Sequence, residues 1–238
     1  MRYDDVIARL EALGSAHSRE GMARFGIDTS TALGISVPAL RSLAREIGRD
    51  HELALRLWQS GVQEARILAA MIDDPAHVTD GQMEAWAADF DSWNVVDGTC
   101  DLFARTELAY EKAFAWSERN EEYVKRAGFV LMAYLAVHDK RASDATIAAF
   151  LPVIERESGD DRNFVKKAVN WALRQIGKRN LALNAAAVEC AERIRTQGSR
   201  SARWIAADAL RELRSEKQLE RLRAKAARSA QSRPSRRL

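Results

Sequence analysis

The chain has 238 residues, and its composition is apolar enough for a sizeable core, with only four prolines and twelve glycines. This composition favours a nearly all-helical protein. It contains no apolar run of about 18 residues, and Met1 to Asp5 lacks the basic and apolar segments of a signal peptide. We therefore expect a cytoplasmic protein with no membrane partner.

Charge is distributed unevenly along the chain. Residues 211–238 carry ten basic and three acidic side chains, a net charge of +7, whereas residues 1–210 have a net charge of −4. Attraction to phosphate depends on where cations cluster, so a nucleic-acid partner would require a local basic surface. The pattern predicts a globular domain over 1–214 and a basic C-terminal helix with a disordered tail over 215–238.

Apolar spacing predicts a succession of amphipathic helices joined by short turns. They are expected over 3–14, 38–47, 51–59, 64–73, a segment capped by Thr79, a segment that begins after Ser92, 107–117, 121–138, 142–157, 161–178, 181–197 and 199–214. The residues that follow Gly14 are expected to form a loop. Residues 229–238 contain nothing to bury, so we expect them to be disordered.

Three helical segments resemble one another and align Arg126, Lys167 and Arg203 at spacings of 41 and 36 residues, with Arg66 as a fainter earlier copy. A degenerate period of roughly 35–45 residues, built of paired helices, is typical of HEAT-like or armadillo-like repeats. The predicted fold is therefore an all-α helical-repeat solenoid. Its second helices would line a concave face, where the aligned cations would form a basic surface.

The segment after Ser92 combines an indole with carboxylates. At about 100° per residue, Trp93, Asp97 and Asp101 form one stripe beside an apolar face that contains Val96. Two interpretations are open. Trp93 can be a half-buried packing residue beside solvated acids, or the stripe can be an acidic site with an aromatic wall.

A second stripe combines an indole with cations, because Trp171 shares a helix face with Lys167, Arg174 and Lys178. Such a pattern suits a groove that grips a phosphate backbone. The alternative is that the cations cover solvated faces and Trp171 packs between repeats. Trp204 and Asp208 repeat the four-residue spacing of Trp93 and Asp97, and we interpret that pair as structural.

The sequence argues against metal hydrolases, nucleotide-dependent enzymes and serine hydrolases. The four histidines are scattered, the cysteines Cys100 and Cys190 are isolated, and neither a glycine-rich phosphate loop nor a nucleophile elbow is present. We expect no metal and no cofactor, with both cysteines buried as small apolar residues.

A carboxylate in a basic groove repels phosphate, so its presence suggests a role near developing positive charge. Glycosidic cleavage passes through an oxocarbenium-like state with such a charge. Asp97 could stabilise that cation or position a water molecule.

Over roughly residues 20–214, the chain resembles the DNA alkylation repair glycosylases of the AlkD family. Those proteins are built of HEAT-like repeats. The residues that carry the resemblance are Phe25-Gly26-Ile27, Ser36 to Ala44, Ser92-Trp93-Asn94-Val95-Val96-Asp97, Lys125-Arg126-Ala127 and Val165 to Arg174. The chain departs from the family pattern in two places. It has no aromatic residue near Gly21 or Met22, and Asn94 replaces an acid.

The resemblance implies excision of N3- or N7-alkylated purines from double-stranded DNA without flipping the base. It assigns the catalytic carboxylate to Asp97, the tryptophans that flank the lesion to Trp93 and Trp171, and the arginine that contacts the DNA backbone to Arg126. The cationic base is already a good leaving group, so no general acid is needed.

We therefore expect a monomeric glycosylase with Asp97, Trp93 and Trp171 as catalytic residues. Its DNA-binding residues would be Arg126, Lys167, Arg174 and Arg203. Two other classes remain open, namely a non-catalytic protein that binds DNA structures and a protein-interaction scaffold.

Overall fold

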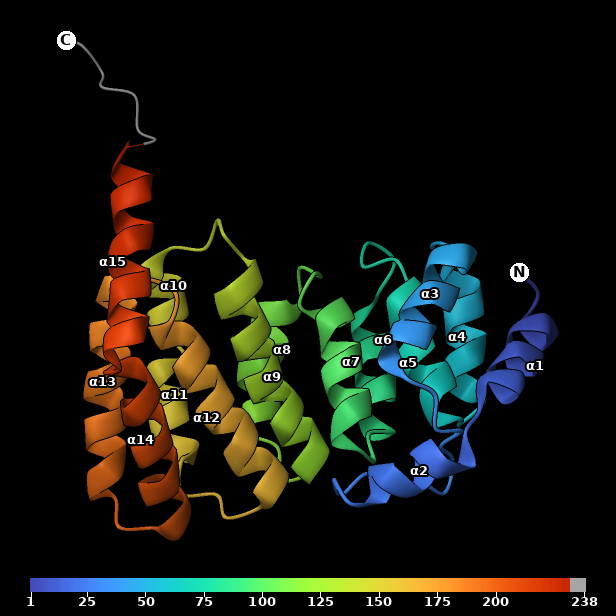
Figure 1. The fold of residues 1–238 in the computed structure, drawn as a ribbon, viewed down its shortest axis with the longest axis horizontal. Helices are drawn as coiled ribbons and strands as arrows, with labels where there is room; N and C mark the ends of the chain where they lie inside the picture. The colour runs from blue at the N-terminus through green and yellow to red at the C-terminus, as the bar shows by residue number, and fades with distance from the viewer. Residues whose placement is uncertain (232–238) are drawn as a thin grey trace. The chain divides into compact units, whose positions relative to one another are not determined.

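The computed structural model describes residues 1–231, which form helices joined by turns and contain no strand (Figure 1). The helices are α1 (Tyr3–Leu13), α2 (Ala16–Ala23), α3 (Val37–Ile47), α4 (His51–Gln59), α5 (Gln63–Ile72), α6 (Asp80–Ala88), α7 (Trp93–Phe103), α8 (Ala109–Ser117), α9 (Glu122–His138), α10 (Asp144–Ala148), α11 (Leu151–Glu157), α12 (Asn163–Gly177), α13 (Leu181–Thr196), α14 (Arg200–Leu213) and α15 (Glu216–Gln231). The predicted all-α class is confirmed.

The chain divides into two compact units, residues 1–111 and the residues from Lys112 onward. In the first unit, α5 packs against α3, α4 and α7, and α1 packs against α4 and α5. In the second unit, α12 packs between α9 and α14, while α13 lies against α11, α12 and α14. Figure 1 shows α12 and α14 in front of α11 and α13. Each unit thus consists of layered helices, as expected for paired-helix repeats.

Several helices begin where the sequence supplies a capping side chain. The oxygen atoms of Ser36, Asp50, Thr79, Ser143, Asn180 and Ser199 each accept a hydrogen bond from a backbone N–H in the first turn of the following helix. These bonds satisfy N–H groups that have no partner within the helix. Short polar residues between apolar runs therefore fix several of the predicted boundaries.

The structure corrects the sequence prediction at α2, which occupies part of the expected loop after Gly14. None of its side chains is buried, so it has no apolar periodicity to detect. Instead, the Ser15 oxygen accepts the Ser18 N–H, and the Ser15 N–H donates to the Leu33 carbonyl at 2.8 Å. The helix is thus set by its cap and by a neighbouring loop.

Two further corrections concern helix ends. The segment 142–157, predicted as one helix, is divided into α10 and α11, and Pro152 lies in the first turn of the latter. Proline cannot donate a backbone hydrogen bond and is favoured at such starts. Residues 229–231, predicted to be disordered, belong to α15. The rest of the predicted tail, 232–238, lies outside the described residues.

Aromatic packing forms the core of the first unit. The rings of Trp58 on α4 and Trp86 on α6 stack at 4.0 Å with an interplanar angle of 4°, and Trp58 donates its indole N–H to Asp89.

Cys100 and Cys190 are fully buried, as predicted. Burial raises the pKa of the Cys190 thiol to about 12, so this side chain acts as a small apolar residue.

A buried carboxylate holds the loop that connects α2 to α3. Glu64 at the start of α5 is 1% exposed, and its two oxygens accept the backbone N–H groups of Leu33, Gly34 and Ile35 at 2.7–3.1 Å. Three such bonds provide much of the solvation that a buried charge loses. The position of this loop therefore depends on one side chain of α5.

Gly34 is required at the centre of this loop. Its φ is +81°, and a Cβ atom at this position would lie 2.3 Å from the Ser15 carbonyl oxygen and 2.7 Å from the Arg19 nitrogen. Only glycine fits both the backbone conformation and this approach to α2. The same loop thereby positions α2.

Across residues 1–231, we find no helix that combines the length and the apolar character needed to cross a membrane.

We expect Glu64→Gln to destabilise the first unit, because the amide would direct N–H groups toward backbone N–H groups. Losing charge-assisted hydrogen bonds should lower the free energy of unfolding by roughly 1.5–3 kcal/mol, measured by urea denaturation. Glu46→Gln is the matched control, since that carboxylate forms an exposed pair with Arg9. Equal effects of the two substitutions would contradict a special role for Glu64.

Candidate nucleic-acid interface

Helix α7 presents an indole and a carboxylate on its half-exposed side. Its buried side includes Val95, Val96 and Cys100, and α7 packs against α5, where Ile67 approaches Gly98. Trp93 and Asp97 are half-buried and one turn apart, while Asp101 is exposed. The predicted division of this helix into a buried face and a neighbouring polar stripe is confirmed.

The indole of Trp93 has a defined orientation. Its Nε1–H donates to the Phe25 carbonyl oxygen at 3.1 Å. Phe25 follows α2 and is 71% exposed, the largest exposure among the large apolar side chains of the described chain. This exposed aromatic residue thus lies in the segment that holds Trp93, three residues beyond Met22. The contact could not be predicted from the sequence, because it joins residues 68 positions apart.

Side chains at the start of α7 link it to α5. The Ser92 hydroxyl donates to the Asn94 side-chain oxygen and caps no backbone N–H of α7, although serine is a favoured N-cap residue. The Asn94 amide donates to Gln63 Oε1 at 2.9 Å, and the Gln63 amide donates to the Asp28 carbonyl at 3.0 Å. Asn94 therefore has a positioning role in this chain.

Helix α12 presents Lys167 and Trp171 one turn apart. Lys167 is exposed and Trp171 is half-buried. The Trp171 ring meets Tyr134 of α9 edge to face, with centroids 5.5 Å apart and an interplanar angle of 72°. Such pairs favour one ring orientation. Tyr134 is a supporting residue that sequence analysis missed, because α9 and α12 come together only in the fold.

Two other cations of the predicted stripe are compensated within the protein. Arg174 pairs with Asp208 at 3.1 Å and also with Glu212, and Lys178 reaches Glu212 at 3.2 Å. Although burial opposes it, hydrogen bonds from Arg174 and Lys178 lower the pKa of Glu212 below its ordinary 4.5. Arg174 therefore joins α12 to α14, and we do not retain it among the phosphate contacts.

Trp204 and Asp208 have separate environments. Asp208 accepts hydrogen bonds from Asn170, Arg174 and Arg211, which supports the structural interpretation of the carboxylate. Trp204 is 40% exposed, and the Lys166 ammonium lies 5.3 Å from the centroid of its ring. The indole thus contributes to the surface of α14.

The three aligned cations differ in exposure. Arg126 is only 6% exposed and donates to the Phe164 carbonyl at 2.8 Å, which ties α9 to the start of α12. Arg203 is exposed and donates to the Gly198 carbonyl. The fainter copy, Arg66, pairs with Asp89 and Asp91. The expected shared basic surface is therefore reduced to Lys167 and Arg203, whose helices α12 and α14 are neighbours.

The two units carry opposite net charge. Residues 1–111 contain ten basic and 19 acidic side chains, a net charge of −9, whereas residues 112–238 contain 27 basic and 15 acidic side chains, a net charge of +12. Asp97 belongs to the acidic unit, and Lys167 and Arg203 belong to the basic one. Attraction to a polyanion must therefore come mainly from the second unit.

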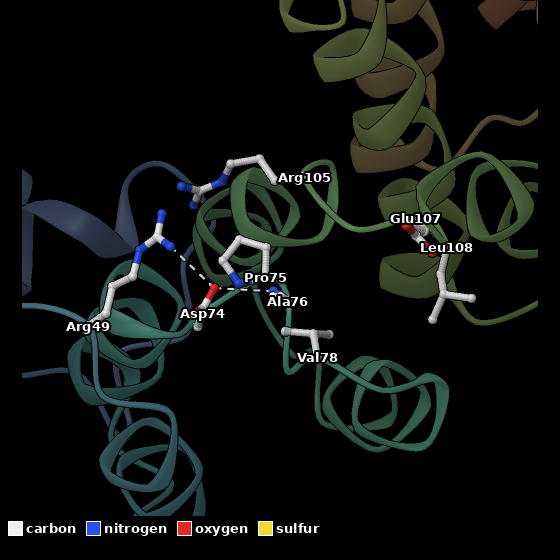
Figure 2. Close-up of a pocket in the computed structure, with 8 residues that line it drawn as sticks. All are labelled: Arg49, Asp74, Pro75, Ala76, Val78, Arg105, Glu107 and Leu108. Carbon is white, nitrogen blue, oxygen red and sulfur yellow. Dashed lines mark hydrogen bonds and ion pairs between the residues drawn. The ribbon is translucent and has the colours of Figure 1, made fainter.

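A cavity of 680 Å³ lies in the first unit, at the loops that follow α3, α5 and α7 (Figure 2). Arg49 and Arg105 line it, and each is paired with an aspartate at 3.3 Å, Arg49 with Asp74 and Arg105 with Asp101. Arg105 lies beyond the end of α7, and neither Trp93 nor Asp97 lines the cavity. The cavity is thus separate from the carboxylate of Asp97.

We find no group of three potential metal ligands within residues 1–231.

The family model described as "DNA alkylation repair enzyme" matches residues 6–223. A solved structure described as "A new family of proteins related to the HEAT-like repeat DNA glycosylases with affinity for branched DNA structures" is similar with a TM-score of 0.75, at 20% identity, over 89% of this chain and 95% of that chain. No curated protein sequence matches. The likeness at this identity establishes the HEAT-like repeat fold.

We expect Arg174→Ala to destabilise the second unit, because it leaves Asp208 and Glu212 without their shared cation. The loss should be roughly 1–3 kcal/mol at pH 7 by urea denaturation. Lys167→Ala, seven residues earlier on the same helix, is the control and should leave stability unchanged.

The pH dependence of this loss of stability should follow from Glu212. Because folding lowers the pKa of Glu212, its contribution is fully present above its ordinary pKa of 4.5 and is lost as pH falls through the folded value. The difference in stability between wild type and Arg174→Ala should therefore shrink below pH 4.5. A difference that does not change with pH would contradict this account.

Proposed function

Because the chain belongs to the DNA alkylation repair enzyme family, we propose that it is a base-excision glycosylase. It would hydrolyse the N-glycosidic bond of N3- or N7-alkylated purines in double-stranded DNA, without flipping the base. The observation that carries this proposal is the placement of Trp93 and Asp97, half-exposed and one turn apart on α7. The indole, fixed by the Phe25 carbonyl, would contact the damaged nucleotide.

The chemistry suits a single carboxylate. Alkylation at N3 or N7 makes the purine cationic, so the bond between C1′ and N9 can break with its electron pair moving to the base, which leaves neutral. Positive charge then develops on the sugar, where the negative Asp97 would stabilise the oxocarbenium-like state. Water adds to C1′ and releases a proton. No acid is needed to protonate the leaving group.

DNA binding would depend on the second unit. Lys167 and Arg203 are exposed cations on neighbouring helices, and Trp171 presents a half-buried indole one turn from Lys167. Exposed cations contact phosphates without reading sequence, and an indole adds stacking. The net charge of +12 on residues 112–238 supports this assignment. Arg126, which is buried, would support the start of α12.

We expect Asp97→Asn to reduce single-turnover excision of N7-methylguanine from duplex DNA by roughly 10-fold to 1000-fold, the effect of losing one preorganised electrostatic contact. DNA affinity should be kept or increase, because a negative charge that repels phosphate is removed. Asp101→Asn is the matched control, since Asp101 lies one turn further along the same helix and pairs with Arg105.

The catalytic and the structural interpretations of Asp97 predict different results for this substitution. A structural Asp97 would give a lower melting temperature, with binding and excision falling together. Equal excision by folded wild type and Asp97→Asn would reject the catalytic role.

The second candidate is a non-catalytic protein that binds DNA structures. The solved structure of similar fold is described as having affinity for branched DNA, which favours this candidate. Absence of free base from every N3- and N7-alkylpurine substrate, together with preferential binding of a three-way junction over a duplex, would favour it over the glycosylase.

A further inference from the structure

Helix α15 has an anchored first half and an exposed second half. Gln218 and Leu222 are buried, and the helix packs against α13 and α14. Residues 223–228 are all exposed, and Figure 1 shows α15 continuing past the neighbouring helices of its unit. From Arg221 to the end of the sequence there are seven basic residues and no acidic residue. This half has no apolar side to bury, so core packing does not explain it.

Three segments converge beside this exposed half. The Lys225 ammonium donates to the Arg179 carbonyl, just beyond α12, at 2.7 Å. The Arg179 guanidinium donates to the carbonyls of Ala136 and Ala142 at 2.9 and 2.8 Å, which fixes the turn between α9 and α10. That turn carries the exposed side chains of Lys140 and Arg141. The fold itself therefore gathers these cations.

Their charges interact. Burial lowers the pKa of Lys225, and the charges of Lys140, Arg179 and Arg221 lower it further. A neighbouring like charge disfavours the protonated form, so these cations repel one another in the free protein. A bound anion would relieve this repulsion.

The carboxylates of the same turn do not cancel this charge. Asp139 accepts the backbone N–H groups of Arg141 and Ala142, and Asp144 accepts hydrogen bonds from the Asn180 amide. Five cations against these two acids leave a local charge of +3. The surface is thus basic even when both of these acids are counted as negative charges.

We propose that Lys140, Arg141, Arg179, Arg221 and Lys225 form a second DNA-backbone contact, which we name the α15 surface. The identity of its partner rests on the proposed function, but the surface is distinct from Trp93 and Asp97. Its cations come from three segments and continue along α15 through Arg223 and Arg228, which suits a polyanion better than a single phosphate. Arg179 lies two residues beyond the end of α12, the helix that carries Trp171, so the surface would hold DNA that extends past that indole.

The test replaces three cations of the surface and keeps Arg179, whose guanidinium fixes the turn, in a Lys140→Ala/Arg221→Ala/Lys225→Ala variant of the full chain. Binding to an undamaged 25-base-pair duplex is measured by fluorescence anisotropy between 50 and 200 mM salt. Each lost phosphate contact should reduce the slope of log K against log salt by about 0.9, or about 2.7 for three contacts. Single-turnover excision at saturating DNA should stay at the wild-type rate, because none of the three side chains belongs to the proposed catalytic residues.

The control is Arg193→Ala/Arg195→Ala/Arg214→Ala, which removes the same net charge from the same unit. These arginines pair with Glu155 and Glu192, so the salt slope should barely change. Equal slopes for both triple variants, or an unchanged slope in the first, would overturn the proposal, provided that melting temperatures match wild type. Lack of excision by the wild type with the slope difference intact would reject the glycosylase and keep the α15 surface.

Discussion

The first unit depends on one buried charge, the carboxylate of Glu64. Its three bonds to backbone N–H groups fix the loop through Gly34, and that loop positions α2. The segment after α2 supplies the Phe25 carbonyl oxygen, which accepts a hydrogen bond from the indole of Trp93 and orients it. A carboxylate on α5 thereby orients an indole on α7 through backbone contacts alone. Rigid support of this kind is what a preorganised electrostatic site requires.

A second principle separates cations that build the fold from cations available to a ligand. Arg66 and Arg174 each have two acidic partners. Arg66 ties α5 to the connection between α6 and α7, and Arg174 joins α12 to α14. Lys167 is exposed on the same helix as Arg174, although the repeat pattern assigns both to one stripe. The difference arises from α14, which places Asp208 and Glu212 within reach of Arg174 but leaves Lys167 facing outward. Spacing along one helix does not carry this information.

The sequence predicts the parts of the structure that depend on local chemistry. Capping residues such as Thr79 and apolar periodicity locate most helices, and the face that carries Trp93 and Asp97 follows from helical geometry. Contacts between distant segments were missed. Helix α2 buries no side chain, Phe25 meets Trp93 across 68 positions, and Tyr134 reaches Trp171 only when α9 packs on α12. Supporting residues are therefore harder to predict than the residues they support.

The division of charge between the units resolves a conflict in the proposed chemistry. A carboxylate that stabilises a sugar cation also repels the phosphates on both sides of that sugar, so a protein that needs it must gain affinity elsewhere. Here Asp97 belongs to a unit with a net charge of −9, and the basic residues concentrate after position 111. Phosphate contacts at Lys167, Arg203 and the α15 surface would offset this repulsion. The unit that contains Asp97 thereby keeps its own surplus of acidic side chains, which favours stabilisation of a developing cation.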